Sequence, residues 1–349
     1  MRYALLDIIK TGRNYFHNVY QPHFPAKTLL LDRNKYKGFY CFNCLAVLNF
    51  HHHYSLIIFP KTFTKMNNRY YSLDVFRGAT VALMILVNNP GSWEHIFTPL
   101  EHAAWHGCTP TDLVFPFFLF AVGNAMSFVM PKFEKEGDAF FLKKVIKRTV
   151  LIVLIGLFLN WSPFVRYDVA GNLVFKGWTW FKKDGSVTGI RVMGVLQRIA
   201  LCYFFASLIV YYLKQKGAYL MSCILLLGYW LITWLLGNSA DPYSLQGYFG
   251  TQVDSKLFGE AHVYHGEGVA FDPEGLASTI AAIVQVVFGY FVGSYVQQKG
   301  KTYEMLSNLF VAAAVLMTAG YCWDMVFPIN KKYGRAVMYC TQAGLPQPF

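Results

Sequence analysis

The sequence predicts an all-α fold, a polytopic bundle of transmembrane helices whose N-terminus is cytoplasmic. Only 14% of the 349 residues are charged, whereas soluble domains carry about 25%. Apolar runs of about 18–22 residues recur along the chain, which is the length that a helix needs to cross a bilayer. The alternating pattern of a membrane barrel is absent. Residues 1–65 carry +7 of the net charge of +12, and the later positive charges cluster in short loops between the apolar runs. Such a distribution is expected of membrane proteins, so we expect no nucleic-acid partner.

Residues 1–65 do not share this pattern. Cys41 and Cys44 form a C-x-x-C motif, and three consecutive histidines follow at 51–53. Zinc ligands must converge tetrahedrally, and three adjacent histidines cannot all turn inward, so we expect no metal site here. We expect an extension that is disordered or not native, with the working protein beginning at Met66. The transmembrane domain then covers residues 66–330, and a polar tail covers 331–349.

About seven spans are expected within this domain. They cover residues 73–87, 113–130, 145–159, 192–213, 219–236, 276–296 and 306–323. Lysine and arginine are frequent between spans two and three, four and five, and six and seven, but residues 89–111 contain none. Because positively charged loops stay in the cytoplasm, the loop 89–111 is predicted to be extracytoplasmic. The loop 161–190 is an exception, because it is basic and yet falls on the predicted outer side.

The loop 89–111 holds three histidines, and His102 lies in the stretch Glu-His-Ala-Ala-Trp-His-Gly, shortly before Asp112 and the second span. Imidazole titrates near neutral pH and can take a proton from an attacking amine or hydroxyl. The alternative is an interfacial belt in which His102 and Trp105 anchor a helix end. His102 and His106 are four residues apart, but no third ligand stands at a supporting interval, so we expect no metal ion.

Other ionisable residues lie within or near the spans. Asp74 and Arg77 are either a helix-end charge pair or a fixed polar site inside the bundle. Arg198 lies roughly 12 Å along the fourth span, where a cation faces the bundle interior, a partner or a water-filled cavity. Residues 261–275 are dense in polar groups. Asp272 can cap the next helix, whereas His265 and Glu267 could bind the hydroxyls and amine of a polar acceptor.

Six motifs occur in a fixed order over residues 69–330. They are S-L-D-V-F-R-G (72–78), L-V-N (86–88), H-A-A-W-H-G (102–107), D-L-V-F-P (112–116), G-V-L-Q-R (194–198) and Y-H-G-E-G-V-A-F-D-P-E-G (264–275). Together they resemble the heparan-α-glucosaminide N-acetyltransferase family of transmembrane acyltransferases, in its bacterial type. The family core has around ten spans, so the resemblance implies that this chain lacks the C-terminal spans of the bundle.

The resemblance implies that acetyl-CoA, as co-substrate, donates an acetyl group to an amino sugar or related glycan on the extracytoplasmic side, without a metal. His102 matches the family's active-site histidine, and either a general base or a transient acetyl carrier is implied. Asn88 and Asp112 are expected to orient His102 or to polarise the thioester carbonyl. The expected substrate-binding residues are His265, Glu267, Arg198, Asp74 and Arg77.

The expected surroundings are a lipid bilayer, in the multi-pass topology of a bacterial inner-membrane protein, and homo-oligomerisation is left open. A sugar transporter or permease is the alternative function. Such a protein should show repeat symmetry and helices broken at mid-membrane. No clear internal repeat is visible and the polar residues lie at span ends, so an acyltransferase is favoured.

Overall fold

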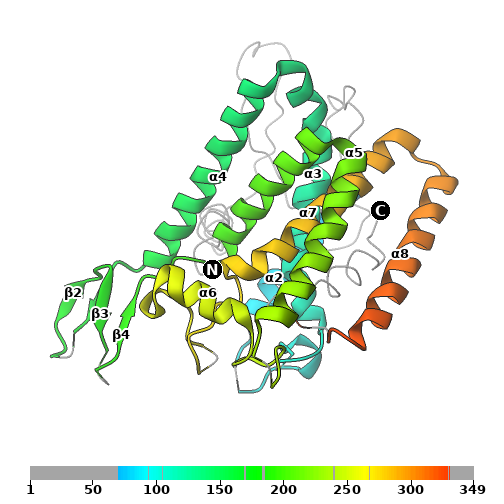
Figure 1. Ribbon diagram of the computed structural model, residues 1–349. Coiled ribbons are helices and arrows are strands. Elements are labelled where there is room, and N and C mark those ends of the chain that lie inside the picture. Colours follow the sequence, from blue (N-terminus) through cyan, green and yellow to red (C-terminus); the bar gives the residue numbers. More distant parts are fainter. Residues whose placement is uncertain are drawn as a thin grey trace, which may run out of the picture. The chain divides into compact units, whose positions relative to one another are not determined.

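The computed structural model describes residues 70–330 apart from Trp93, Ala104, Val169, Lys183, Asp184, Ser239, Glu267 and Ile329. The predicted extension, with its C-x-x-C and histidine cluster, and the predicted polar tail lie outside these residues. The described part is mostly helical (Figure 1). Its α-helices are α2 (Tyr71–Asn88), α3 (Val114–Glu136), α4 (Asp138–Trp161), α5 (Val195–Leu236), α6 (Phe249–Phe258), α7 (Leu276–Lys299) and α8 (Tyr303–Asp324).

Five of these helical segments are long and apolar enough to cross a membrane: α2, the segment Pro110–Glu136 that contains α3, α5, α7 and α8. They confirm the helical membrane class. The predicted fourth and fifth spans are both parts of α5, which has 42 residues and a non-helical backbone at Lys214 (φ 55°, ψ −172°). A helix of that length measures about 63 Å, twice what one crossing needs, so the kink at Lys214 separates two spans.

The predicted third span lies in α4, which is not one of the five segments. Its first half carries the basic residues Lys143, Lys144, Lys147 and Arg148. Its second half is apolar. Each of the seven predicted spans therefore corresponds to a helical segment. By length and hydropathy, five of the described helical segments could cross a membrane, and α5 among them is long enough for two spans.

Helix α7 is the most buried of the five, and it packs against α3 and α5. Glycines stand where α3 and α7 meet: Gly123 on α3 faces the α7 backbone, and Gly289 and Gly293 on α7 face α3. Small residues let helix backbones approach closely, which drives helix association in membranes through van der Waals contact. The α3–α7 contact therefore forms the centre of the bundle.

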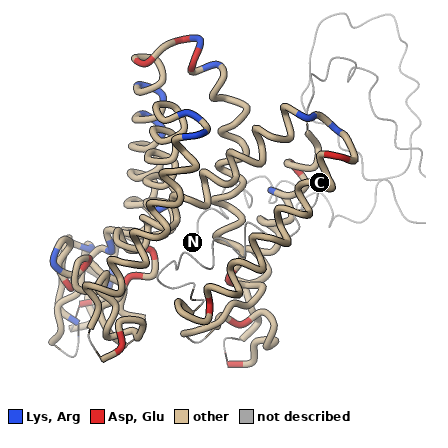
Figure 2. The backbone as a smooth tube through the Cα atoms, turned by 45° about the vertical axis from the view of Figure 1, so that its right-hand side comes forward, with Lys and Arg blue, Asp and Glu red and all other residues tan. Residues whose placement is uncertain are grey.

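The bundle has two chemically different ends. Figure 2 shows lysine and arginine at the end formed by the α3–α4 turn, the α5 kink and the α7–α8 turn, and a second group on the α4–α5 connection at the other end. At the first of these ends Lys214 pairs with Glu134 and Lys299 with Glu304. We refer to this as the basic end. The other end, where α2 finishes and α3 begins, we name the site end. It also carries the α4–α5 connection and the residues between α5 and α7 (Figure 1).

The α4–α5 connection, predicted only as a loop, forms two antiparallel hairpins. β1 (Val165–Tyr167) pairs with β2 (Leu173–Phe175), and β3 (Thr179–Phe181) pairs with β4 (Val187–Gly189). The strands consist mostly of β-branched and aromatic residues, which favour extended structure. Gly171 and Gly185 supply the positive φ of the two turns. The strands are only three residues long, too short for the sequence pattern to reveal them.

Candidate functional site

His102 lies on the connection from α2 to α3, which contains the short 3-10 helices η1 (Thr98–Leu100) and η2 (Pro110–Leu113). The sequence Thr-Pro-Thr-Asp at 109–112 starts η2, because Thr109 is the N-cap and proline fits the first helical position. The hydroxyl of Thr111 donates to the carbonyl oxygen of Leu100 at 2.7 Å. This bond joins η1 to η2 and fixes the two ends of the segment that bears His102.

The carboxylate of Asp112 is almost completely buried, with 2% of the side chain exposed. Its Oδ2 accepts three hydrogen bonds, from the backbone N–H groups of Ala103 (3.2 Å) and Thr109 (3.1 Å) and from the Thr109 hydroxyl (3.1 Å). Its Oδ1 lies 2.7 Å from Nδ1 of His102. One residue therefore both caps the helix that leads into α3 and contacts the imidazole.

The contact with Asp112 selects one form of the His102 ring. A carboxylate that accepts several hydrogen bonds has no proton to donate, so Nδ1 of His102 supplies the proton in their bond. In the neutral ring, Nε2 then keeps its lone pair. The His102 side chain is 47% exposed, so the imidazole is accessible from the site end. A buried acid that holds an accessible imidazole in this way is the arrangement of a general base or a nucleophile.

Two loops from the α5–α7 region pack against the histidine loop through Trp105. The indole Nε1 donates to the carbonyl oxygen of Tyr243 at 3.1 Å, and the ring meets Phe271 edge-on with centroids 5.5 Å apart. Below them, the hydroxyls of Tyr229 and Tyr248 are buried and 2.8 Å apart. The site end is therefore built from three segments that are distant in sequence.

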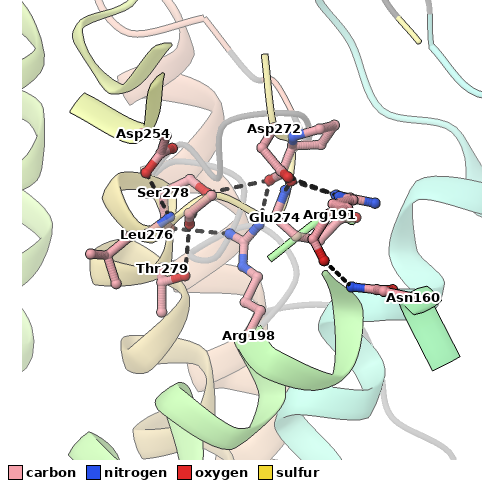
Figure 3. A network of polar contacts seen from close by, with 11 residues as sticks. Asn160, Arg191, Arg198, Asp254, Asp272, Glu274, Leu276, Ser278 and Thr279 are labelled. Carbon is pink, nitrogen blue, oxygen red and sulfur yellow. Dashed lines mark hydrogen bonds and ion pairs between the residues drawn. The ribbon is translucent and has the colours of Figure 1, made fainter. Parts of the chain in front are cut away.

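A network of charged groups lies beside these loops (Figure 3). Arg191 forms hydrogen-bonded ion pairs with both Asp272 and Glu274, with Nε 2.8 Å from Oδ2 of Asp272. The side chain of Asn160, near the end of α4, donates to the carbonyl oxygen of Arg191 at 2.9 Å. Burial raises the pKa of the Asp272 carboxyl, and the bonds from Arg191 offset this only in part. The network joins α4, β4 and the turn before α7.

Arg198 is 2% exposed and belongs to the same network. Its guanidinium donates to the carbonyl oxygens of Pro273 (2.6 Å) and Ser278 (3.1 Å), and it lies 5.4 Å from the centre of the Phe115 ring. The structure thus places this cation in the bundle interior, as its depth in the span predicts. These contacts fix the start of α7 against α3 and α5, and a role in substrate binding stays a prediction.

Asp254 on α6 caps α7 from the side. Its Oδ1 accepts from the backbone N–H groups of Leu276 (3.0 Å) and Ala277 (3.4 Å). Burial raises the pKa of this carboxyl to about 7, the nearby charge of Asp272 adds to the rise, and the two backbone bonds oppose it. A group with such a pKa changes its protonation near neutral pH.

We therefore expect stability to depend on pH through Asp254. The unfolded carboxyl has a pKa of 3.8, so between that pH and 7 the folded protein holds a proton that the unfolded chain has lost. The free energy of unfolding should then fall as the pH rises through this window. Asp254→Asn keeps an acceptor for the α7 N–H groups but cannot titrate. In detergent, its melting temperature should fall less between pH 5 and pH 8 than that of the wild type, and equal slopes would contradict the assignment.

The other predicted site residues are spread more widely. Asn88 is the last residue of α2, and its side chain donates to the carbonyl oxygen of Met84 at 2.8 Å, within its own helix. Asp74 and Arg77 lie in the first turns of α2. His265 is exposed in the loop before α7, and Glu267 lies outside the described residues. His102 and Asp112 are brought together and Arg198 lies in the adjacent network, whereas no contact joins Asp74 or Arg77 to these residues in the part of the chain that the structure describes.

Three contributors to the site were missed by sequence reasoning. Thr109 donates twice to Asp112, Arg191 organises the charged network, and Tyr243 accepts from Trp105 through its backbone. Thr109 could have been found, because Thr-x-x-Asp before an apolar run resembles a capping box. Arg191 precedes the helix in an unpatterned segment, and a backbone acceptor leaves no trace in the sequence.

Comparison with known proteins now bears on this site. The family model described as "Heparan-alpha-glucosaminide N-acetyltransferase, catalytic" matches residues 69–246, just over half of the chain. The chain belongs to this family. The proteins named heparan-alpha-glucosaminide N-acetyltransferase from Homo sapiens and Mus musculus are 29% and 26% identical to it. The matches cover 68% and 78% of this chain, but only 40% and 47% of the relatives. The chain thus spans less than half the length of these two proteins.

Within this heparan-alpha-glucosaminide N-acetyltransferase family member, the matched region contains His102, Asp112, Arg198 and both hairpins. The turn that pairs with Arg191, and all of α7, lie beyond residue 246. The resemblance expected from the sequence motifs is confirmed. The family match and the geometry of the His102–Asp112 pair concern the same part of the chain.

Proposed function

We propose that this chain is a membrane acetyltransferase that moves an acetyl group from acetyl-CoA to the amino group of a glucosamine-type glycan. The observation that carries the proposal is the 2.7 Å contact between His102 Nδ1 and the buried carboxylate of Asp112. It provides an oriented imidazole at the mouth of a membrane bundle, and membership of an N-acetyltransferase family supplies the reaction class.

The proposed reaction takes place on the extracytoplasmic side. The basic end of the bundle gathers the lysines and arginines of the α3–α4 turn, the α5 kink and the α7–α8 turn (Figure 2). Loops of this charge remain in the cytoplasm, so the basic end is cytoplasmic in the proposal. The site end, with His102, then faces the opposite side, where a glycan acceptor would be met.

Two routes use the same atoms of His102. In the first, Nε2 takes a proton from the acceptor amine while the amine nitrogen attacks the thioester carbon. A C–N bond forms and the C–S bond breaks. The imidazolium then gives its proton to the CoA thiolate. In the second, Nε2 itself attacks the thioester carbon, the C–S bond breaks and CoA leaves as the thiolate. The acceptor amine then attacks the acetyl carbon of the acetyl-histidine, the bond from that carbon to Nε2 breaks, and the amine's proton passes to Nε2 and from there to the thiolate. In both routes Asp112 holds the Nδ1 proton and stabilises the positive charge that develops on the ring.

The remaining predicted residues have secondary roles in this proposal. His265 and Glu267, in the loop before α7, would contact the hydroxyls and amine of the acceptor. Asn88 closes α2 at the site end, close in sequence to the histidine loop, and would polarise the thioester carbonyl. Asp74 and Arg77, in the first turns of α2, would contact the acetyl-CoA donor.

The test is acetyl transfer from radiolabelled acetyl-CoA to glucosamine, measured in membranes that contain the protein. His102→Ala should lower the rate by about 10²–10⁴-fold, which is the contribution of a general base. The matched control is His95→Ala, which removes an exposed histidine from the same loop and should keep the wild-type rate. Equal rates for the two variants would remove His102 from its role. Uptake of labelled sugar into sealed vesicles without acetylation would favour a transporter instead.

Rapid quenching separates the two routes. Mixing the protein with labelled acetyl-CoA in the absence of acceptor should give a labelled peptide containing His102 if the acetyl group is carried covalently. Ping-pong kinetics should accompany this label. A ternary-complex rate law without a labelled peptide indicates the general-base route.

A further inference from the structure

The two hairpins enclose a pocket that the proposed reaction does not use. It has a volume of about 480 Å³, within the range of small-ligand pockets. It is lined by Arg166, Asp168, Ala170, Thr179, Trp180, Phe181 and Val187. The walls combine aromatic rings, a hydroxyl and a guanidinium. Such a lining suits a ligand that has both apolar faces and polar groups.

Arg166 is the central polar group of this pocket. Its guanidinium lies over the ring of Trp180, 5.7 Å from the centroid, and the Lys176 amine lies 5.2 Å from the same ring. Among the described residues, no hydrogen-bond partner lies within reach of the buried Nε of Arg166. Its Nη1 donates a long hydrogen bond, 3.5 Å, to the carbonyl oxygen of Tyr167. The guanidinium therefore retains donors for a ligand, and its planar fork suits carboxylate, sulfate or phosphate groups.

The charge of the hairpins points the same way. Loops on the outer side of membrane proteins generally avoid lysine and arginine, yet this connection carries Arg166, Lys176 and Lys182. The acidic side chain in the pocket wall, Asp168, is engaged by Asn172, which donates its backbone N–H at 2.8 Å and its side-chain amide at 3.4 Å. The topology therefore does not account for these positive charges, and the Asp168 carboxylate is bound by Asn172 within its own turn.

Hydrogen bonds connect this pocket to the loops around His102. The N–H of Ile190 donates to the carbonyl oxygen of Trp178 at 3.0 Å, while the Ile190 carbonyl oxygen lies 2.7 Å from Nδ1 of the buried His262. Arg191, the next residue, pairs with Asp272, one residue from the Phe271 ring that packs on Trp105. The pocket is therefore held at the same end of the bundle as the histidine.

We propose that the hairpin pocket binds an acidic sugar unit of the acceptor, one that carries a carboxylate or a sulfate. The inference rests on the proposed transfer to a glycan, and it adds a second contact away from the amine that reacts. Arg166 pairs with the acidic group, Thr179 hydrogen-bonds sugar hydroxyls, and the rings of Trp180 and Phe181 contact the apolar face of the sugar. The occupant is an acidic oligosaccharide rather than the headgroups of a membrane.

Binding is tested with the full chain in nanodiscs of neutral lipid. The probes are a sulfated hexasaccharide that ends in glucosamine and the same hexasaccharide without sulfate. The sulfated probe should bind more tightly, with an affinity that falls as salt is added. Arg166→Gln should weaken its binding roughly ten-fold or more, as expected for the loss of a charge-assisted bidentate contact. Arg166→Lys, which keeps the charge and most of the stem, should give an intermediate loss.

The matched control is Lys256→Gln, which removes one positive charge from the exposed surface of α6 at the same end. It should bind the sulfated probe as the wild type does. Equal losses in Arg166→Gln and Lys256→Gln would overturn the proposal, because they would show a diffuse charge effect. Competition by phosphatidylserine vesicles as strong as that by unlabelled hexasaccharide would also overturn it, in favour of lipid. Melting temperatures of all variants show whether the hairpins still fold.

Kinetics then separate this proposal from the proposed function. In Arg166→Gln, the ratio of kcat/KM for the sulfated hexasaccharide to that for glucosamine should fall roughly ten-fold, through KM. If the enzyme is active and this ratio is unchanged, the hairpin pocket does not bind the acidic sugar, but the proposed acetyltransferase function is unaffected. Probe binding that depends on Arg166 in a protein without acetyl transfer supports the pocket and overturns the proposed function.

Discussion

Replacing Asp112 with asparagine should lower the rate of acetyl transfer by about 10²–10⁴-fold while the bundle remains folded. The side-chain carbonyl oxygen of asparagine is also an acceptor, so it can keep the bonds that Thr109 and Ala103 donate to Asp112. Its amide group would then face Nδ1 of His102 as a donor, and the ring would have to carry its proton on Nε2. The nitrogen that both routes require would lose its lone pair.

Asp112→Ala serves as the comparison for this variant. It removes the acceptor of the bonds from Ala103 and Thr109 as well as the histidine contact, so the melting temperature should also fall, by the equivalent of about 1–3 kcal/mol for buried donors left without an acceptor. The measurements are kcat in membranes and the melting temperature in detergent for both variants. An Asp112→Asn protein with near wild-type kcat would show that the ring form selected by Asp112 does not matter. A parallel loss of activity and stability in Asp112→Asn would show that Asp112 acts only as a cap.

The second large effect is expected at the contact between α3 and α7. A Cβ atom added at Gly123 would lie 1.8 Å from the carbonyl oxygen of Val286, and one added at Gly289 would lie 2.1 Å from that of Phe120. Both obstacles are backbone atoms and cannot rotate away. Gly123→Ala should therefore force the helices apart at a cost of about 1–3 kcal/mol, or a fall in melting temperature of at least about 2 °C. Gly123→Leu should not yield a folded protein.

Gly228 provides the matched control, because it lies in the apolar helix α5 and a Cβ there meets nothing within 4 Å. Gly228→Ala should leave the melting temperature unchanged or raise it, since alanine favours a helix over glycine by about 1 kcal/mol. Fluorescence-detected size-exclusion chromatography after heating compares the variants. If Gly123→Ala and Gly228→Ala have the same melting temperature, the close approach of α3 and α7 does not hold the bundle together.

The helical membrane class follows from the sequence because long apolar runs are a strong signal for spans. The sequence also located the junction between the fourth and fifth predicted spans, because the basic residues around Lys214 interrupt the apolar run. In the structure α5 continues through this point as a kinked helix. The hairpins between α4 and α5 escaped prediction. Strands of three residues carry too few positions to show a period of two, and their pairing depends on turns at Gly171 and Gly185.

Of the site, the proximity of His102 and Asp112 was accessible from the sequence. They are ten residues apart on one connection, and the resemblance singled out this histidine. Arg191 and Asp272 are 81 residues apart, and nothing local in either segment indicates that they pair. Such contacts depend on how the helices pack, which a single sequence does not reveal. Arg198 is intermediate, since its depth in a span predicted burial but did not reveal its carbonyl partners.

The double use of the Asp112 carboxylate has a consequence for how this protein can vary. Catalytic groups often reduce stability, and substitutions that remove them then stabilise the fold. Here the oxygen that begins the helix into α3 and the oxygen that holds the imidazole belong to the same side chain. A substitution that sacrifices the chemistry therefore gains no stability in return. When activity is not under selection, folding still opposes replacement of this aspartate by residues that cannot accept the bonds from Thr109 and Ala103, whereas asparagine is tolerated.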